Sequence, residues 1–169
     1  GLRVGREVGE GIVYEPLKRP LTVYDLLRHT AGLTYGVFFR SPVKGLYLEA
    51  GVDRFDLSRE VFLERLAALP LRFQPGETFE YGLATDLLGH LLEALAGRSL
   101  AELLEERLFR PLGMKDSGFQ AKDPARLAQP FPKDPETGHS LRLLPVETPP
   151  PRYAGGMGGV GTAADYLAF

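Results

Sequence analysis

The chain has 169 residues, of which 44% are hydrophobic and 25% are charged, and its formal net charge is -2. This length and balance are typical of one ordinary globular domain with a substantial core. The small net charge gives no electrostatic basis for binding nucleic acid or an anionic membrane, and no apolar run is long enough to span a bilayer. The absence of cysteine excludes a disulfide scaffold and a thiol nucleophile, but it does not fix the compartment.

The first part of the chain alternates short apolar stretches with glycine and proline. Residues 1–21 follow this pattern, which predicts a short hairpin or an extended arm. Thr22 is a suitable N-cap for a helix over Val23–His29, and Gly32 predicts its stop. One short helix should therefore follow the hairpin or arm.

The next part combines an irregular stretch with a regular one. Residues 34–57 are rich in aromatic side chains, and we expect them to be irregular. Ser58 predicts the N-cap of an amphipathic helix that Pro70 ends, and a turn follows at residues 74–77.

Leucines at helical spacing indicate two further helices. Gly97 ends the first of them, and the Ser99–Glu102 capping box opens the second, which Pro111 ends. The periodicity predicts that the following leucines form core rather than a cofactor site: Leu83, Leu87, Leu88, Leu91, Leu92, Leu95, Leu100, Leu103, Leu104 and Leu108.

The last part of the chain is rich in proline. Residues 120–154 hold eight of the fourteen prolines, which predicts a long irregular cover. A final helix should begin at Thr162, and the chain stops within its first turns at Phe169. Because domains rarely end inside an amphipathic helix, we interpret residues 1–169 as part of a longer domain.

Three segments resemble one protein family in type and order. They are Thr22–Leu33, the stretch from Phe73 to Phe119 that contains Tyr81, and the glycine-rich Gly155–Phe169. They resemble the middle of the serine β-lactamase/penicillin-binding-protein family, including its class C-related carboxylesterase branch. The resemblance implies a chain that is mainly α with long loops, the helical lobe of the β-lactamase/transpeptidase-like α+β fold. Residues 1–169 would then be a partial domain without the α/β parts.

The same resemblance implies one catalytic residue in this chain, Tyr81. In the family, a tyrosine at this place carries the proton of the nucleophilic serine, which lies in an upstream Ser-x-x-Lys motif. The third family motif would lie beyond Phe169, so we expect the chain alone to be inactive. Gly82 replaces the family's serine or alanine, and Leu83 replaces the asparagine that helps β-lactamases hold a substrate amide.

The implied reaction is cleavage of a small-molecule ester through an acyl-serine intermediate, with no cofactor. A β-lactamase or DD-peptidase-like hydrolase acting on an amide is one alternative, and a non-catalytic binding or structural fragment is another. The isolated lobe would expose an apolar face, at which we expect Leu83, Met157, Val160 and Phe169, and it could form a homo-oligomer through that face.

Two motif matches have a simpler explanation. Ser41-Pro-Val-Lys44 matches Ser-x-x-Lys literally, but it lies in the segment expected to be irregular and follows Thr22–Leu33, which the motif should precede. Gly156–Gly161 matches G-x-G-x-x-G without a preceding strand, so we expect these glycines to let the backbone cross close to another element.

The histidines give little support for a metal site. Asp86 and His90 lie one helical turn apart and could form a ligand pair, but no third ligand is evident. His29 belongs to a turn, and His139 is far from the others in sequence. We therefore predict no metal.

Overall fold

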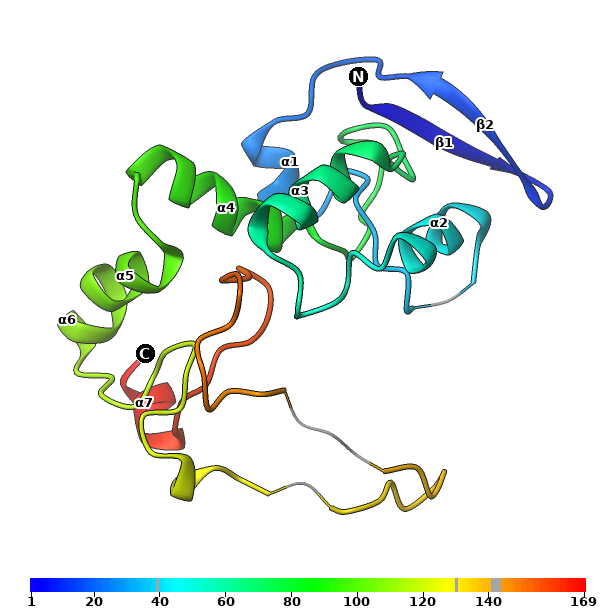
Figure 1. Cartoon of the computed structure of the whole chain (residues 1–169). Coiled ribbons are helices and arrows are strands. Elements are labelled where there is room, and N and C mark those ends of the chain that lie inside the picture. The colour runs from blue at the N-terminus through cyan, green and yellow to red at the C-terminus, as the bar shows by residue number, and fades with distance from the viewer. Residues whose placement is uncertain (39, 130, 141–143) are drawn as a thin grey trace. The chain divides into compact units, whose positions relative to one another are not determined.

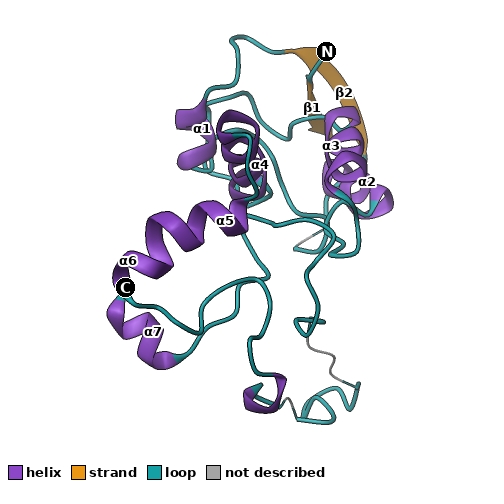
Figure 2. Cartoon of the chain, turned by 60° about the vertical axis from the view of Figure 1, so that its left-hand side comes forward, coloured by secondary structure: helices purple, strands orange, loops and turns teal. Residues whose placement is uncertain are grey.

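The computed structural model describes residues 1–38, 40–129, 131–140 and 144–169. They form two compact units: Gly1–Leu100 with Pro151–Met157, and Ala101–Pro150 with Gly158–Phe169. Helices supply most of the regular structure, and the named strands of the described residues belong to one hairpin (Figures 1 and 2). This agrees with a mainly helical chain. Within the described part, no helix combines the length and the apolar character needed to cross a membrane.

The first unit begins with an antiparallel hairpin of β1 (Arg3–Val8) and β2 (Gly11–Pro16). Gly9 in the connecting turn has a φ of 58°, which glycine adopts without steric strain. Val4 is buried and forms a parallel bridge with Leu71, which joins the hairpin to the core. Of the two alternatives for residues 1–21, the structure contains the hairpin.

The helices of the first unit are α1 (Val23–Leu27), α2 (Pro42–Ala50), α3 (Arg59–Ala68) and α4 (Ala84–Ala96). The caps predicted for α1 and α3 are confirmed, since Thr22 and Ser58 each accept a hydrogen bond from a backbone N–H in the first turn. Helix α4 ends at Gly97, also as predicted. Helix α1 packs against α4, and α2 lies against the hairpin (Figure 1).

Helix α2 contradicts the expectation that residues 34–57 are irregular. Ser41 caps it by accepting a hydrogen bond from the backbone N–H of Lys44 at 3.4 Å, and Pro42 stands in its first turn. Gly51, with a φ of 60°, ends it. Proline favours the first turn of a helix, and glycine its end, so both residues were start and stop signals rather than signs of disorder.

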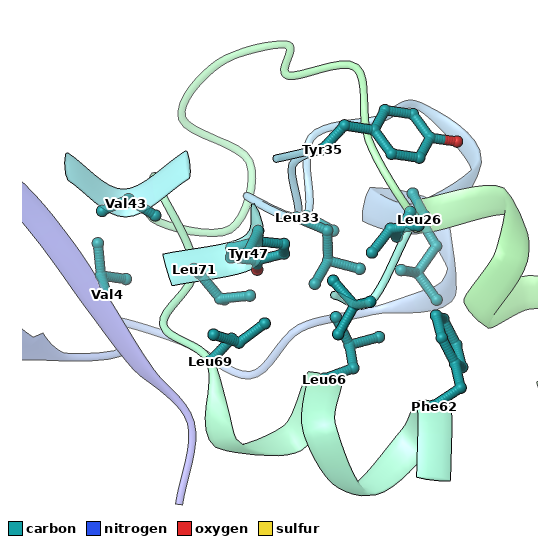
Figure 3. Packing of buried hydrophobic residues seen from close by; sticks show 14 of the residues in the cluster. Val4, Leu26, Leu33, Tyr35, Val43, Tyr47, Phe62, Leu66, Leu69 and Leu71 are labelled. Atoms are coloured by element: carbon teal, nitrogen blue, oxygen red, sulfur yellow. The ribbon is translucent and has the colours of Figure 1, made fainter. Parts of the chain in front are cut away.

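One hydrophobic core holds the first unit together (Figure 3). Tyr47 of α2 and Phe62 of α3 have no exposed surface, and Leu71 between α3 and α4 is 1% exposed. Burying a large apolar side chain stabilises a fold by about 1.5–3 kcal/mol. Elements that are too short to be stable alone therefore keep their positions through this shared core.

The leucines of α4 and of its N-cap position, Leu83, contribute less to the core than predicted. Leu83 is fully buried, and Leu87 and Leu88 pack against the core, but Leu92 and Leu95 are 50% and 77% exposed. The buried face of α4 instead carries Ala84, Asp86, Gly89, His90 and Glu93. The prediction was wrong for the two outer leucines because helical spacing identifies residues that share a face, not the neighbour that covers it.

From Leu100 the chain forms one helical run of α5 (Leu100–Leu104), a π-helical turn η1 (Glu105–Phe109) and α6 (Arg110–Leu112). Pro111 was expected to end this run, but the run continues to Leu112 and stops at Gly113. A proline removes one helical hydrogen bond, and π-type turns change the bonding pattern locally. The later helices are η2 (Pro124–Arg126) and α7 (Ala163–Ala168), which Thr162 caps as predicted.

Candidate functional site

Tyr81 lies in the first unit, just before α4, and its side chain is half exposed. Its ring centroid is 5.3 Å from that of His29, 5.4 Å from Tyr35 and 6.3 Å from Phe38. Phe79 lies 5.8 Å from His29 on the same measure. We call these five residues the aromatic cluster. It presents the Tyr81 phenol on an apolar, partly open surface.

Two close backbone contacts fix the chain on both sides of Tyr81. The backbone N–H of Glu80 donates to the carbonyl of His29 at 2.8 Å. A Cβ at Gly82 would lie 2.5 Å from Cα of Thr34, and nearer still to the Leu33 carbonyl oxygen, so no larger side chain fits there. Gly82 therefore lets α4 begin directly against residues 33–34, which places Tyr81 beside the end of α1.

Glu80, the buried residue directly before Tyr81, fixes the same stretch of backbone through its side chain. Its carboxylate accepts hydrogen bonds from the Thr34 hydroxyl at 2.5 Å and the Arg72 guanidinium at 2.7 Å, and it pairs with the Lys44 ammonium at 3.0 Å. Burial raises the pKa of Glu80, but the hydrogen bonds from Thr34 and Lys44 and the charge of Arg72 outweigh burial and leave that pKa below its usual range. Glu80 is therefore an ionised anchor.

Lys44 has a structural partner on each side. Besides its ion pair with Glu80, its Nζ donates to the carbonyl of Phe38 at 3.0 Å. Ser41 stands at a helix start, so the expectation that Ser41-Pro-Val-Lys44 is irregular was wrong. The Lys44 head group is nevertheless directed to Glu80 and Phe38. This arrangement holds the Phe38 segment near Tyr81.

Tyr35 connects the aromatic cluster to a buried ion pair. Its hydroxyl donates to Asp86 Oδ2 at 3.4 Å, and Asp86 Oδ1 lies 3.6 Å from an Nη of Arg152. Burial raises the pKa of Asp86, while the charge of Arg152 lowers it. Burial and the charge of Asp86 both raise the pKa of the Tyr35 phenol. Tyr35 is therefore a neutral donor, and Tyr81 is the exposed phenol of the cluster.

The segment that carries Arg152 passes very close to α4. A Cβ at Gly155 would collide with the Thr85 carbonyl oxygen, and one at Gly156 would lie 2.7 Å from Asp86 Oδ2. The backbone of Gly155 thus lies against the backbone of α4, and that of Gly156 lies against the Asp86 side chain. The expected close approach to another element is confirmed at Gly156. The two glycines let the ion pair between Asp86 and Arg152 form.

Asp86 and His90 do not form a ligand pair. Asp86 pairs with Arg152, whereas His90 Nδ1 lies 3.1 Å from Glu93 Oε2. His29 Nε2 lies 3.2 Å from the Thr85 hydroxyl. Within the described ranges, no group of three or more histidine, aspartate or glutamate side chains could hold a metal ion.

The sequence singled out Tyr81 but missed the residues that surround it. Tyr35, Phe38 and Lys44 fell in the segment expected to be irregular. Glu80 could have been suspected only from its position directly before Tyr81. Arg152 had none, because nothing in a proline-rich segment indicates a partner on a distant helix.

Comparison with known proteins identifies the family of the chain. The chain matches the beta-lactamase family over residues 12–169. It belongs to that family. A curated relative is esterase EstB of Burkholderia gladioli, which is 34% identical over 173 residues that cover 90% of this chain and 43% of EstB. The chain thus spans about two fifths of the length of curated relatives such as EstB.

Solved structures of a hydrolase and of a penicillin-binding protein share its fold. EstCE1, described as a hydrolase with promiscuous acyltransferase activity, has a TM-score of 0.72 and 29% identity, covering 97% of this chain and 47% of EstCE1. A penicillin-binding protein from Bacillus halodurans has a TM-score of 0.59 and 24% identity, covering 88% of this chain and 44% of that protein. The resemblance found in the sequence is confirmed, and the fold is of the β-lactamase/transpeptidase type.

Proposed function

We propose that this chain supplies the tyrosine of a serine hydrolase site that cleaves small-molecule esters through an acyl-serine intermediate. Residues 1–169 would form the helical lobe of a longer domain, whose Ser-x-x-Lys segment precedes them in the chain. The observation that carries the proposal is the half-exposed phenol of Tyr81, on a backbone fixed from both sides. Its setting in a beta-lactamase-family chain with an esterase relative supports the same assignment.

The chemistry requires a base that accepts one proton and later returns it. The serine hydroxyl would give its proton to the Tyr81 phenolate while its oxygen attacks the ester carbonyl. The alcohol would leave with the proton from Tyr81, and water would then release the acyl group by the same route. A free phenol has a pKa of about 10, so a neighbouring ammonium is needed to favour the phenolate near neutral pH. Lys44 is paired with Glu80, so we assign that role to the lysine of the Ser-x-x-Lys segment.

Leu83 favours an ester substrate over a β-lactam. It stands where an asparagine would hold the substrate amide in β-lactamases and DD-peptidases, and it is fully buried in the core. A buried alkyl side chain can neither reach a substrate nor donate a hydrogen bond. A β-lactamase or DD-peptidase-like activity is therefore the second candidate. A non-catalytic binding or structural role is the third.

The test is Tyr81→Phe in the full-length protein that contains this chain. Loss of a general base should lower the acylation rate by about 10²- to 10⁴-fold, with much less change in substrate binding. The measurement is single-turnover acylation by p-nitrophenyl butyrate, and Tyr24→Phe, an exposed tyrosine on α1, is the matched control. A normal acylation rate in Tyr81→Phe would reduce Tyr81 to a packing residue.

A further inference from the structure

His29 stands where a helix most often has glycine. Its N–H donates to the Leu26 carbonyl at 3.2 Å, and the N–H of Thr30 donates to the Asp25 carbonyl at 2.8 Å. These two bonds form a Schellman ending of α1, whose left-handed position glycine occupies without strain. His29 has a φ of 54°, the only positive value among the non-glycine residues that the structure describes. A histidine here therefore carries a backbone cost that glycine would avoid.

The His29 side chain makes contacts that a glycine at this position could not make. Its ring lies 5.3 Å from the Tyr81 ring and 5.8 Å from the Phe79 ring, measured between centroids. Nε2 lies 3.2 Å from the Thr85 hydroxyl, in the first turn of α4. Glycine could make none of these contacts. The residue that bears the strain is thus also the one that joins the end of α1 to the Tyr81 phenol and the start of α4.

The backbone of His29 reinforces the same link. Its carbonyl accepts the N–H of Glu80, the residue before Tyr81, at 2.8 Å. A fixed backbone alone leaves the tyrosine side chain free to choose between rotamers. The imidazole, held by its contact with the Thr85 hydroxyl, packs beside the Tyr81 ring and restricts the rotamers that Tyr81 can adopt. Strained backbone that persists beside a candidate site is a recognised indication of function.

We propose that His29 is a positioning residue that orients the Tyr81 phenol. The proposal rests on the proposed function, in which Tyr81 transfers the proton of the nucleophile. Its rival is a purely structural role, in which the imidazole only fills space at the end of α1. The two differ in one respect. A structural residue changes stability first, whereas a positioning residue changes the behaviour of Tyr81 even when stability is kept.

The experiment uses His29→Gly in the full-length protein that contains this chain. Glycine removes the strain and the ring together, so the urea midpoint should stay unchanged or rise, while acylation should slow by about 10- to 100-fold with little change in KM. His29→Asn, which tolerates the left-handed conformation but lacks the ring, should slow acylation similarly. Thr85→Val should give a smaller effect in the same direction. His139→Asn is the matched control, because His139 is exposed and lies in the other unit.

A spectroscopic measurement separates the two roles directly. With ring-¹³C-labelled tyrosine, the Tyr81 resonance is the one that disappears in Tyr81→Phe. Loss of the imidazole alone moves the chemical shift of a ring 5.3 Å away, so the measured quantity is the set of nuclear Overhauser contacts from the Tyr81 ring to Tyr35 and Phe38, which reports the rotamer of Tyr81. These contacts should change in His29→Gly but not in His139→Asn. Full acylation in His29→Gly, or slow acylation with the contacts of the Tyr81 ring unchanged, would overturn the proposal. If Tyr81→Phe itself acylates normally, the proposed function fails, and the contacts of the Tyr81 ring still report whether His29 orients it.

Discussion

Asp86 of α4 and Arg152, at the end of the proline-rich segment, form an ion pair whose side chains are 0% and 1% exposed. The guanidinium also lies 4.2 Å from the centroid of the Phe62 ring and donates to the Arg54 carbonyl at 3.3 Å. Burial lowers the pKa of Arg152, against the charge of Asp86, which raises it. Each charge is therefore tolerated inside the protein only because the other is present.

We predict that Arg152→Leu destabilises the protein by about 3–5 kcal/mol at neutral pH, because it leaves the Asp86 carboxylate without a counter-ion. The loss should shrink as the pH falls, since burial raises the pKa of Asp86 and its protonated form needs no counter-ion. Urea denaturation at several pH values measures this. Asp86→Leu combined with Arg152→Leu should cost less than the two single changes added together. Strict additivity would show that the pair is not coupled.

The ionised carboxylate of Asp25 should contribute to the free energy of unfolding at neutral pH, and this contribution should be lost in acid. Arg19 donates to its carboxylate through two nitrogens, each at 2.7 Å, and the Thr22 hydroxyl donates at 2.7 Å. These hydrogen bonds, the one from Arg19 first, hold the pKa of Asp25 far below its usual range against the effect of burial. A lowered pKa in the folded state contributes stability above the unfolded value of about 4 and loses it as the pH falls further.

The expected result is that Asp25→Asn lowers the urea midpoint at pH 7 and that the difference from the wild type narrows steadily below about pH 4. Asp56→Asn, which breaks an exposed pair with Arg54, is the matched control and should change the midpoint little. A difference that persists unchanged at pH 2 would mean that the Asp25 charge does not stabilise α1.

The 169-residue chain on its own is expected not to hydrolyse p-nitrophenyl butyrate or a chromogenic cephalosporin. Its single Ser-x-x-Lys match directs Lys44 to Glu80 and to the Phe38 carbonyl, and Ser41 serves as the cap of α2. Turnover should therefore equal that of Ser41→Ala and of Tyr81→Phe. Activity that disappears in Ser41→Ala would identify Ser41 as an unexpected nucleophile.

The isolated chain should self-associate or bind a hydrophobic dye. Phe38, Phe79 and Tyr81 of the aromatic cluster are 50–63% exposed and lie together, and apolar patches of this kind mark interaction surfaces. The expectation that Leu83 belongs to this surface was wrong, because it is fully buried. Phe169 is exposed as expected.

Light scattering and dye titration should detect the association, and Phe38→Ser with Phe79→Ser should weaken it. Phe131→Ser, at an exposed phenylalanine of the other unit, is the control. A tight monomer that binds no dye would show that the aromatic cluster is covered within the chain.

The sequence alone determined the features that depend on neighbours within one turn. Three helix starts were predicted correctly from Thr22, Ser58 and Thr162, because the side chain of a capping residue accepts a hydrogen bond from a backbone N–H two or three residues away. The end of α4 was predicted from Gly97, which adopts the left-handed conformation there. The motif around Tyr81 was also readable, because its family resemblance lies in consecutive residues. Interactions between residues that are close in sequence can therefore be predicted from a short stretch of the chain.

Only the tertiary structure decided which distant residues meet. Leu83 and Leu95 follow the same helical pattern, yet one is buried and the other is exposed, because burial depends on the elements packed outside the helix. The partners of Lys44, Asp86 and His29 likewise come from segments far along the chain. A buried charge is tolerated only beside its partner, and where that partner stands is set by the path of the whole backbone, which no short stretch of sequence records.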